Sequence, residues 1–139
     1  PAEALVELLR VLRPGGGIGL RSPDWGGFLM HPEISGPVSY YERLQRNNGG
    51  NLYAGRTLPA LLRKAGFTDV RFSARYEVYP EPELIANYLA ETIEASAGPN
   101  GAGPEESEAR RLGGELRAWA KDPDALFAQC WGEAVGRKP

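Results

Sequence analysis

Residues 57–79 read TLPALLRKAGFTDVRFSARYEVY, and this stretch carries two local signals of structure. The apolar positions of its first half have the spacing of one helix face: Leu58, Leu61, Leu62 and Ala65. Over residues 70–79, apolar and polar residues alternate, which is typical of a strand with one covered and one wetter face. The stretch therefore predicts a helix that Thr57 caps at its start and Gly66 at its end, followed by a long strand.

The segment before it predicts a first helix and a first strand. Residues 2–12 repeat apolar positions at helical spacing, and Pro14 ends that helix. Residues 15–17 are three glycines that turn the chain. Residues 17–21 are short and apolar, which predicts a buried strand. Residues 22–27 are rich in turn formers, which predicts a loop.

The remaining segments continue this alternation of helices and strands. The further predicted elements, in order, are a helix entered at residues 35–37 and ended by residues 47–50, an amphipathic helix over residues 84–93, a flexible connector over residues 98–104, a helix over residues 105–120, and a last strand over residues 126–135. The order is typical of an α/β protein.

Composition narrows the classes of function. The 139 residues are 42% hydrophobic and 24% charged, with a formal net charge of -2, so nothing suggests an electrostatic grip on nucleic acid. The single cysteine, Cys130, excludes an internal disulfide and a cysteine-based zinc cluster, and the single histidine argues against a histidine-rich metal site. No apolar run approaches the ~18 residues that a membrane helix needs. The expected location is cytoplasmic, with no membrane partner.

Three passages together resemble a known family. Residues 11–16 (VLRPGG) precede a short strand and Asp24, residues 58–67 (LPALLRKAGF) precede a long alternating strand, and residues 127–139 close the chain. In this order and spacing they resemble the later part of class I S-adenosylmethionine-dependent methyltransferases of the small-molecule type. The resemblance covers most of the chain except roughly residues 28–50 and 98–124.

The resemblance implies an α/β fold that is the C-terminal half of a Rossmann-like methyltransferase sheet. It would hold the fifth, sixth and seventh strands with flanking helices, in a mixed sheet whose last strand inserts antiparallel between the other two. The chain would be a single partial domain: residues 1–27 as helix, strand and substrate-side loop, residues 28–56 as a lid-like insertion, and residues 57–139 as the last two strands with their helices.

The resemblance also implies that the cofactor-binding half precedes residue 1. The family's glycine-rich loop and its acidic residue for the ribose hydroxyls would both lie there. Residues 15–17 follow a helix and precede a strand, the reverse of the order that a cofactor-cradling loop needs. We therefore expect no cofactor-binding residues here, and no useful affinity of this chain alone for S-adenosylmethionine.

The loop predicted over residues 22–27 holds the first candidates for substrate binding. In open α/β sheets, ligands bind beyond the carboxyl ends of the strands. Asp24 could accept a hydrogen bond from a substrate and Trp25 could supply an apolar wall. The structural alternative is that Asp24 caps the local turn and Trp25 packs.

Other candidates lie in the lid-like insertion. His31 is a weak candidate for a general base, because its ordinary pKa lies near neutrality, although a lone histidine in a loop is usually unremarkable. Tyr40, Tyr41 and Tyr53 could cover a flat substrate, or they could pack in a core. Arg56 could hold an anionic substrate or pair with a neighbouring acid. Cys130 is expected to be a small buried hydrophobe.

These patterns support a first hypothesis and two alternatives. The first is the C-terminal part of a methyltransferase that acts on a small molecule. The second is a non-catalytic module that forms a homodimer or binds a partner, because residues 17–21 would form an exposed apolar sheet edge that invites pairing. The third is that a separate polypeptide supplies the missing N-terminal half.

Overall fold

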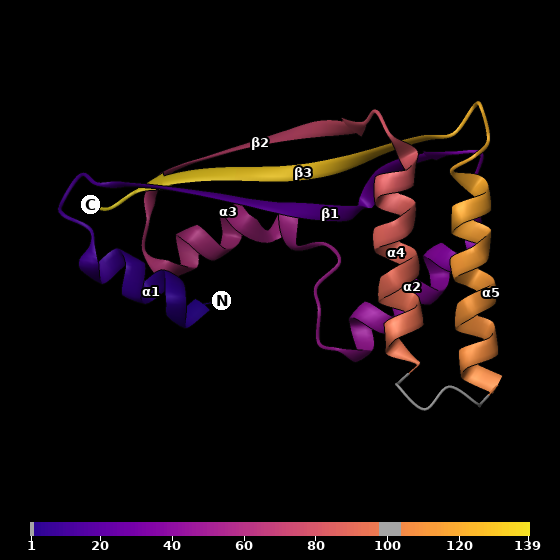
Figure 1. The fold of residues 1–139 in the computed structure, drawn as a ribbon. Coiled ribbons are helices and arrows are strands. Elements are labelled where there is room, and N and C mark those ends of the chain that lie inside the picture. Colours follow the sequence, from indigo (N-terminus) through magenta and orange to yellow (C-terminus); the bar gives the residue numbers. More distant parts are fainter. Residues whose placement is uncertain (1, 98–103) are drawn as a thin grey trace. The chain divides into compact units, whose positions relative to one another are not determined.

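The structure, a computed structural model, describes residues 2–97 and 104–139, so most of the connector predicted over residues 98–104 lies outside the described residues. Figure 1 shows the elements along the chain. They are α1 (Ala2–Val11), β1 (Gly17–His31), α2 (Ser35–Asn47), α3 (Ala54–Ala65), β2 (Thr68–Tyr79), α4 (Pro82–Ser96), α5 (Pro104–Trp119) and β3 (Leu126–Arg137). All the helices and strands predicted from the sequence are present, with shifted boundaries.

The three strands form one sheet in the order β1-β3-β2. The last strand, β3, therefore lies between the two earlier strands and runs antiparallel to both (Figure 1). The predicted antiparallel insertion of the last strand is confirmed. Because β1 and β2 are not neighbours, the sheet is complete only when the last residues of the chain are in place.

The first strand is much longer than predicted. β1 extends over Gly17–His31, so the loop expected at residues 22–27 is wrong. Pro23, Gly26 and Gly27 suggested a loop, but β1 is an edge of the described sheet, and an edge strand tolerates proline because one side of its backbone has no partner strand. Asp24 and Trp25 consequently lie within a strand, not beyond its end.

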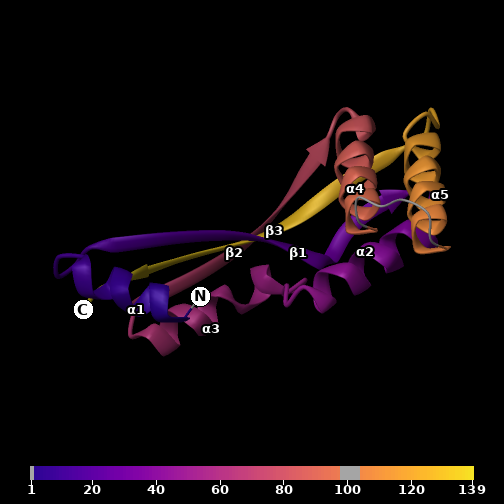
Figure 2. The ribbon, with the colours of Figure 1, turned by 60° about the horizontal axis from the view of Figure 1, so that its bottom comes forward.

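The chain divides into two compact units, and each is described by itself. Unit 1 comprises residues 1–27, 53–77 and 129–139, and unit 2 comprises residues 28–52 and 78–128. In unit 1, α1 and α3 pack on each other and lie on the same face of the strands (Figures 1 and 2). The buried residues of this core are Leu5, Leu58, Leu62, Phe67 and Ala134.

Hydrogen bonds stabilise the ends of the unit 1 helices. Gly66 has a φ of 101°, and its N–H and that of Phe67 donate to carbonyls of the last turn of α3, so the predicted glycine C-cap is confirmed. Lys138 Nζ donates to the carbonyls of Arg10 and Leu12 at the end of α1. The start of α3 differs from the prediction. The helix begins at Ala54, and Thr57 lies inside it with its hydroxyl donating to the Ala54 carbonyl.

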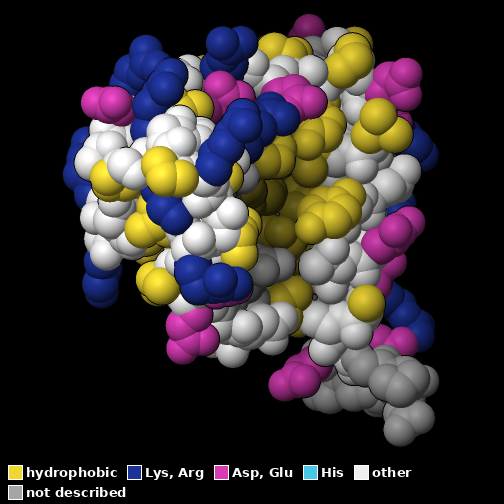
Figure 3. Space-filling view, turned by 90° about the vertical axis from the view of Figure 1, so that its left-hand side faces the viewer, with side chains coloured by type: hydrophobic (Ala, Val, Ile, Leu, Met, Phe, Trp, Pro, Cys, Tyr) yellow, Lys and Arg dark blue, Asp and Glu magenta, His cyan; other side chains and the backbone are white. Residues whose placement is uncertain are grey.

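The second strand lacks the covered face that its alternation predicted. Of its apolar residues, only Val70 packs against the unit 1 core, whereas Phe72, Tyr76 and Val78 are 47%, 53% and 60% exposed. Figure 3 shows hydrophobic side chains at the surface, with charged side chains beside them. The prediction failed because alternation shows which residues share a face, not whether anything covers it.

Unit 2 is built on three helices. α4 and α5 pack along each other, and α2 packs against both. The Arg117 guanidinium on α5 donates to both carboxylate oxygens of Glu94 on α4, at 2.6 and 2.9 Å, and Trp119 Nε1 donates to the Pro32 carbonyl at 2.8 Å. Among the described residues, no helix has both the length and the apolar character needed to cross a bilayer.

Candidate functional site

Asp24 and Arg56 form a polar pair in unit 1 that three hydrogen bonds join. Asp24 Oδ1 accepts hydrogen bonds from Arg56 Nη2 at 2.6 Å and from the Gly26 N–H at 3.1 Å. Its Oδ2 accepts from Arg56 Nε at 2.7 Å and from the Arg56 backbone N–H at 3.1 Å. The carboxylate of β1 therefore holds both the side chain and the first-turn backbone of α3, and it leaves little of Asp24 for a substrate.

Two glycines bring that helix close enough for the pair to form. Gly55 packs its backbone against β1 and β3. A Cβ there would lie 2.8 Å from the Ser22 carbonyl oxygen and 3.0 Å from the Gly132 nitrogen. A Cβ on Gly132 would in turn lie 2.7 Å from the Gly55 Cα. Because the backbones are in direct contact, the Arg56 side chain reaches Asp24, although 32 residues separate the two in the sequence.

Aromatic and polar neighbours complete the cluster. The Arg56 guanidinium lies 4.9 Å from the centre of the Tyr53 ring, a cation–π contact. The Gln129 amide on β3 donates to the Asp24 carbonyl at 3.2 Å. Trp25 is buried. The structure thus brings together three predicted candidates, Asp24, Tyr53 and Arg56, and their roles in substrate binding stay predictions.

The two side chains of the Asp24–Arg56 pair differ in their exposure to solvent. The Asp24 side chain is 6% exposed and the Arg56 side chain 57%. Hydrogen bonds from Arg56 are the main reason that the pKa of Asp24 is lowered, against the opposing effect of burial. Asp24 is therefore ionised at neutral pH, and the exposed part of the guanidinium is the only part of the pair that a dissolved anion could reach.

The other candidates lie in unit 2. His31 is exposed at the end of β1. The Tyr40 hydroxyl lies 3.4 Å from Ser96 Oγ, and the Arg43 guanidinium lies 5.3 Å from the Tyr40 ring centre. Tyr41 is buried, and burial raises the pKa of its phenol, with a hydrogen bond to Tyr88 adding to the effect. This geometry is that of a packed side chain, and a lid role for these tyrosines stays a prediction.

A cavity that no sequence pattern predicted lies at the end of β1. It has a volume of about 380 Å³ and lies in unit 2, between residues 28–30 and the first half of α2. Two carboxylates line it, those of Glu33 and Glu42. The available signal was the pair of glutamates beside an apolar run, but spacing alone did not show that they share a cavity with Phe28.

The described connections from strand to helix lack the glycine turn of a nucleoside site. Two strands lead directly into helices, β1 into α2 and β2 into α4, and neither connection contains a glycine. A nucleoside site of this kind needs a tight glycine turn that lets the backbone approach the ligand. The only glycine run before a strand, residues 15–17, forms a turn after α1.

Comparisons with known proteins give limited likenesses. No family model matches the chain. An uncharacterized 37.1 kDa protein in transposon Tn4556 of Streptomyces fradiae is 37% identical over 68 residues, which is 48% of this chain. That match spans 20% of the relative's length, so it does not assign this chain to a family.

Three of the solved structures that match this chain are methyltransferases. Two structures of Haemonchus contortus phosphoethanolamine N-methyltransferase 2, one with phosphomonomethylethanolamine and S-adenosylhomocysteine and one with S-adenosyl-L-methionine, match with a TM-score of 0.44 and 16% identity. They cover 99% of this chain and 30% of theirs. A putative sarcosine dimethylglycine methyltransferase from Galdieria sulphuraria has a TM-score of 0.36 and 17% identity, over 99% of this chain and 47% of its own.

Proposed function

We propose that this chain is the C-terminal part of an S-adenosylmethionine-dependent methyltransferase that acts on a small molecule. The strand order is the observation that carries the proposal. A last strand inserted antiparallel between two earlier ones is what the resemblance of residues 11–16, 58–67 and 127–139 implies, and the order β1-β3-β2 agrees with it. The family's numbering of these strands, and the division of the chain into a sheet part and a lid-like part, belong to the proposal.

Uncovered apolar surface also supports the proposal. On α1, Val6, Leu8 and Val11 are 56%, 43% and 58% exposed, although Leu5 on the same helix is buried. Exposed apolar surface costs about 25 cal/mol per Å² relative to burial. Further chain that covers this helix and adjoins β1 would remove that cost. In the proposal, that further chain carries the cofactor site.

The test is cofactor binding at native length. We expect the protein purified from its source to exceed the 15.1 kDa of these residues and to bind S-adenosylhomocysteine saturably in a calorimetric titration. Residues 1–139 alone, checked for folding by circular dichroism, should give no binding heat. Absence of binding by the native-length protein would contradict the methyltransferase proposal. Binding by residues 1–139 alone would contradict only the upstream placement of the cofactor site.

A homodimerising module is the second candidate, because β1 is an edge of the described sheet. An edge strand presents unpaired backbone groups that can pair with another chain. On this hypothesis residues 1–139 should sediment as a dimer at tens of micromolar, and an Arg21→Pro variant, which removes a backbone donor from β1, should sediment as a monomer. A wild-type monomer at that concentration would exclude the hypothesis.

A further inference from the structure

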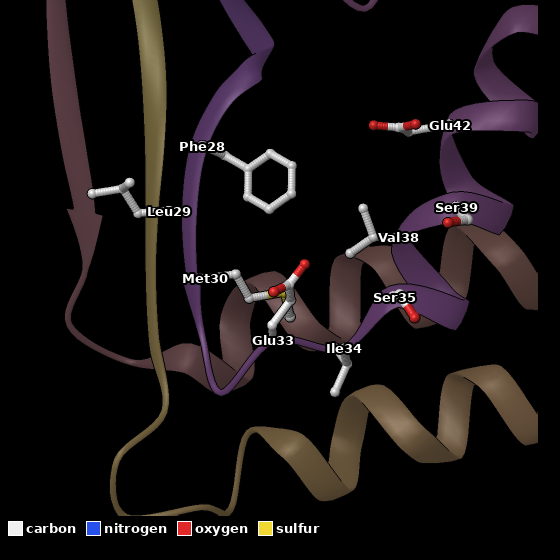
Figure 4. A pocket seen from close by; sticks show the side chains of 9 residues that line it. All are labelled: Phe28, Leu29, Met30, Glu33, Ile34, Ser35, Val38, Ser39 and Glu42. Atoms are coloured by element: carbon white, nitrogen blue, oxygen red, sulfur yellow. The ribbon is translucent and has the colours of Figure 1, made fainter.

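The cavity at the end of β1 is lined by residues from one stretch of the chain. Phe28 and Met30 on β1 face Val38 on α2, and the carboxylates of Glu33 and Glu42 point into the space between them (Figure 4). All five residues lie within unit 2, so the cavity needs no contribution from unit 1. Its volume of about 380 Å³ is within the range of small-ligand sites.

The side chains that line this cavity carry negative charge. The residues that line it include two glutamates and no lysine, arginine or histidine. Arg46 lies one helical turn from Glu42, with 3.7 Å between Nη2 and Oε2, and offsets part of its charge from the helix surface. The Glu42 side chain is 29% exposed, so it is partly shielded from bulk water, whereas Glu33 is exposed. A concave site of one sign of charge concentrates ions of the opposite sign.

The apolar side chains of the cavity favour an organic cation over a metal ion. Phe28 stacks on Phe127 with 5.6 Å between ring centres, which fixes its ring beside the carboxylates. An aromatic face attracts a cation, and the thioether and methyl groups of Met30 and Val38 accept an apolar substituent. A metal ion fits less well, because no group of three or more His, Cys, Asp and Glu side chains suited to a metal is found within residues 2–97 and 104–139.

We propose that the cavity bounded by Phe28, Glu33 and Glu42 binds a small organic ammonium ion that carries an apolar substituent. Both carboxylates then face the positive nitrogen, and the Phe28 wall takes the substituent. A neutral apolar molecule would bring no positive charge to the carboxylates, and an anion would be repelled. The proposal does not depend on methyl transfer, since it rests only on the residues of this cavity.

The test compares three probes that share a benzyl group on the native-length protein, which is labelled with ¹⁵N for spectroscopy. Benzyltrimethylammonium should bind saturably and shift the amide resonances of residues 28–42. Benzyl alcohol and phenylacetate should bind about tenfold more weakly or not at all, because they lack the positive charge. Raising the ionic strength should weaken binding of the ammonium probe, as expected for partly exposed charges.

Charge-removing variants give the second arm. Glu42→Gln and Glu33→Gln should each weaken ammonium binding about three- to fivefold, the scale of one partly exposed ion pair. Glu108→Gln on α5 makes the same charge change at an exposed site outside the cavity lining and should leave binding unchanged. Equal affinity for benzyl alcohol, shifts confined to residues outside 28–42, or an equal effect of Glu108→Gln would each overturn the proposal. So would absence of any binding of the ammonium probe.

Discussion

Asp24→Asn should lower the free energy of unfolding by about 2 kcal/mol, the scale of losing charge-assisted hydrogen bonds at a buried carboxylate. The variant keeps the shape of the side chain. However, it places an amide N–H₂ where Oδ1 or Oδ2 now accepts hydrogen bonds, and both oxygens accept from Arg56. The first turn of α3 then keeps only part of its hydrogen bonding to Asp24. Urea denaturation of wild type and variant at neutral pH measures the difference.

The pH dependence of that difference identifies its cause. The pKa of Asp24 is lowered in the folded protein, so ionisation of its carboxylate stabilises the fold above the ordinary carboxyl pKa of about 3.9. That contribution is lost as the pH falls through the lowered pKa, so wild type should approach the variant in strongly acidic solution. Asp124→Asn, the same change at an exposed residue, should show neither effect. A constant difference at all pH values would attribute the loss to packing instead.

Local signals explain why much of the fold was predictable. The helix α3 and its end were readable because a helical apolar face and a glycine C-cap depend on neighbouring residues only. The misreading of β1 has the opposite cause. Whether Pro23 breaks a strand depends on whether that strand is an edge, and edge position is set by β3, far later in the sequence. Likewise, the exposure of Phe72 depends on what covers β2, which no local pattern contains.

The candidate site was likewise only partly predictable from the sequence. Asp24 and Arg56 were identifiable one at a time as charged residues in unusual places. Their pairing was not, because nothing in the sequence spacing joins β1 to the start of α3. Gly55, directly before Arg56, was the available signal, since a glycine at a helix start can mark a close backbone approach. The cavity beside Phe28 was missed because it requires β1 to continue past residue 27.

The close approach at Gly55 makes Gly132→Ala the second strongly destabilising change. A Cβ on Gly132 would lie 2.5 Å from the Gly55 carbonyl carbon and would also overlap its oxygen. These atoms are backbone, so the overlap cannot be relieved by a side-chain rotation and must push the start of α3 away from β3. Overpacking of this kind costs about 1–3 kcal/mol, and we expect the upper end because Arg56 moves with the helix.

Gly19→Ala is the matched control for this prediction. Gly19 lies on β1 in the same sheet, and a Cβ there meets no atom within 4 Å, so alanine should leave stability unchanged or raise it by about 0.5 kcal/mol. If Gly132→Ala separates α3 from the sheet, it should also reduce the effect of Asp24→Asn, since the Arg56 hydrogen bonds are already weakened. A double-mutant cycle in urea measures that coupling. Full additivity would mean that the backbone contact and the ion pair hold α3 independently, and the account of how Arg56 reaches Asp24 would fail.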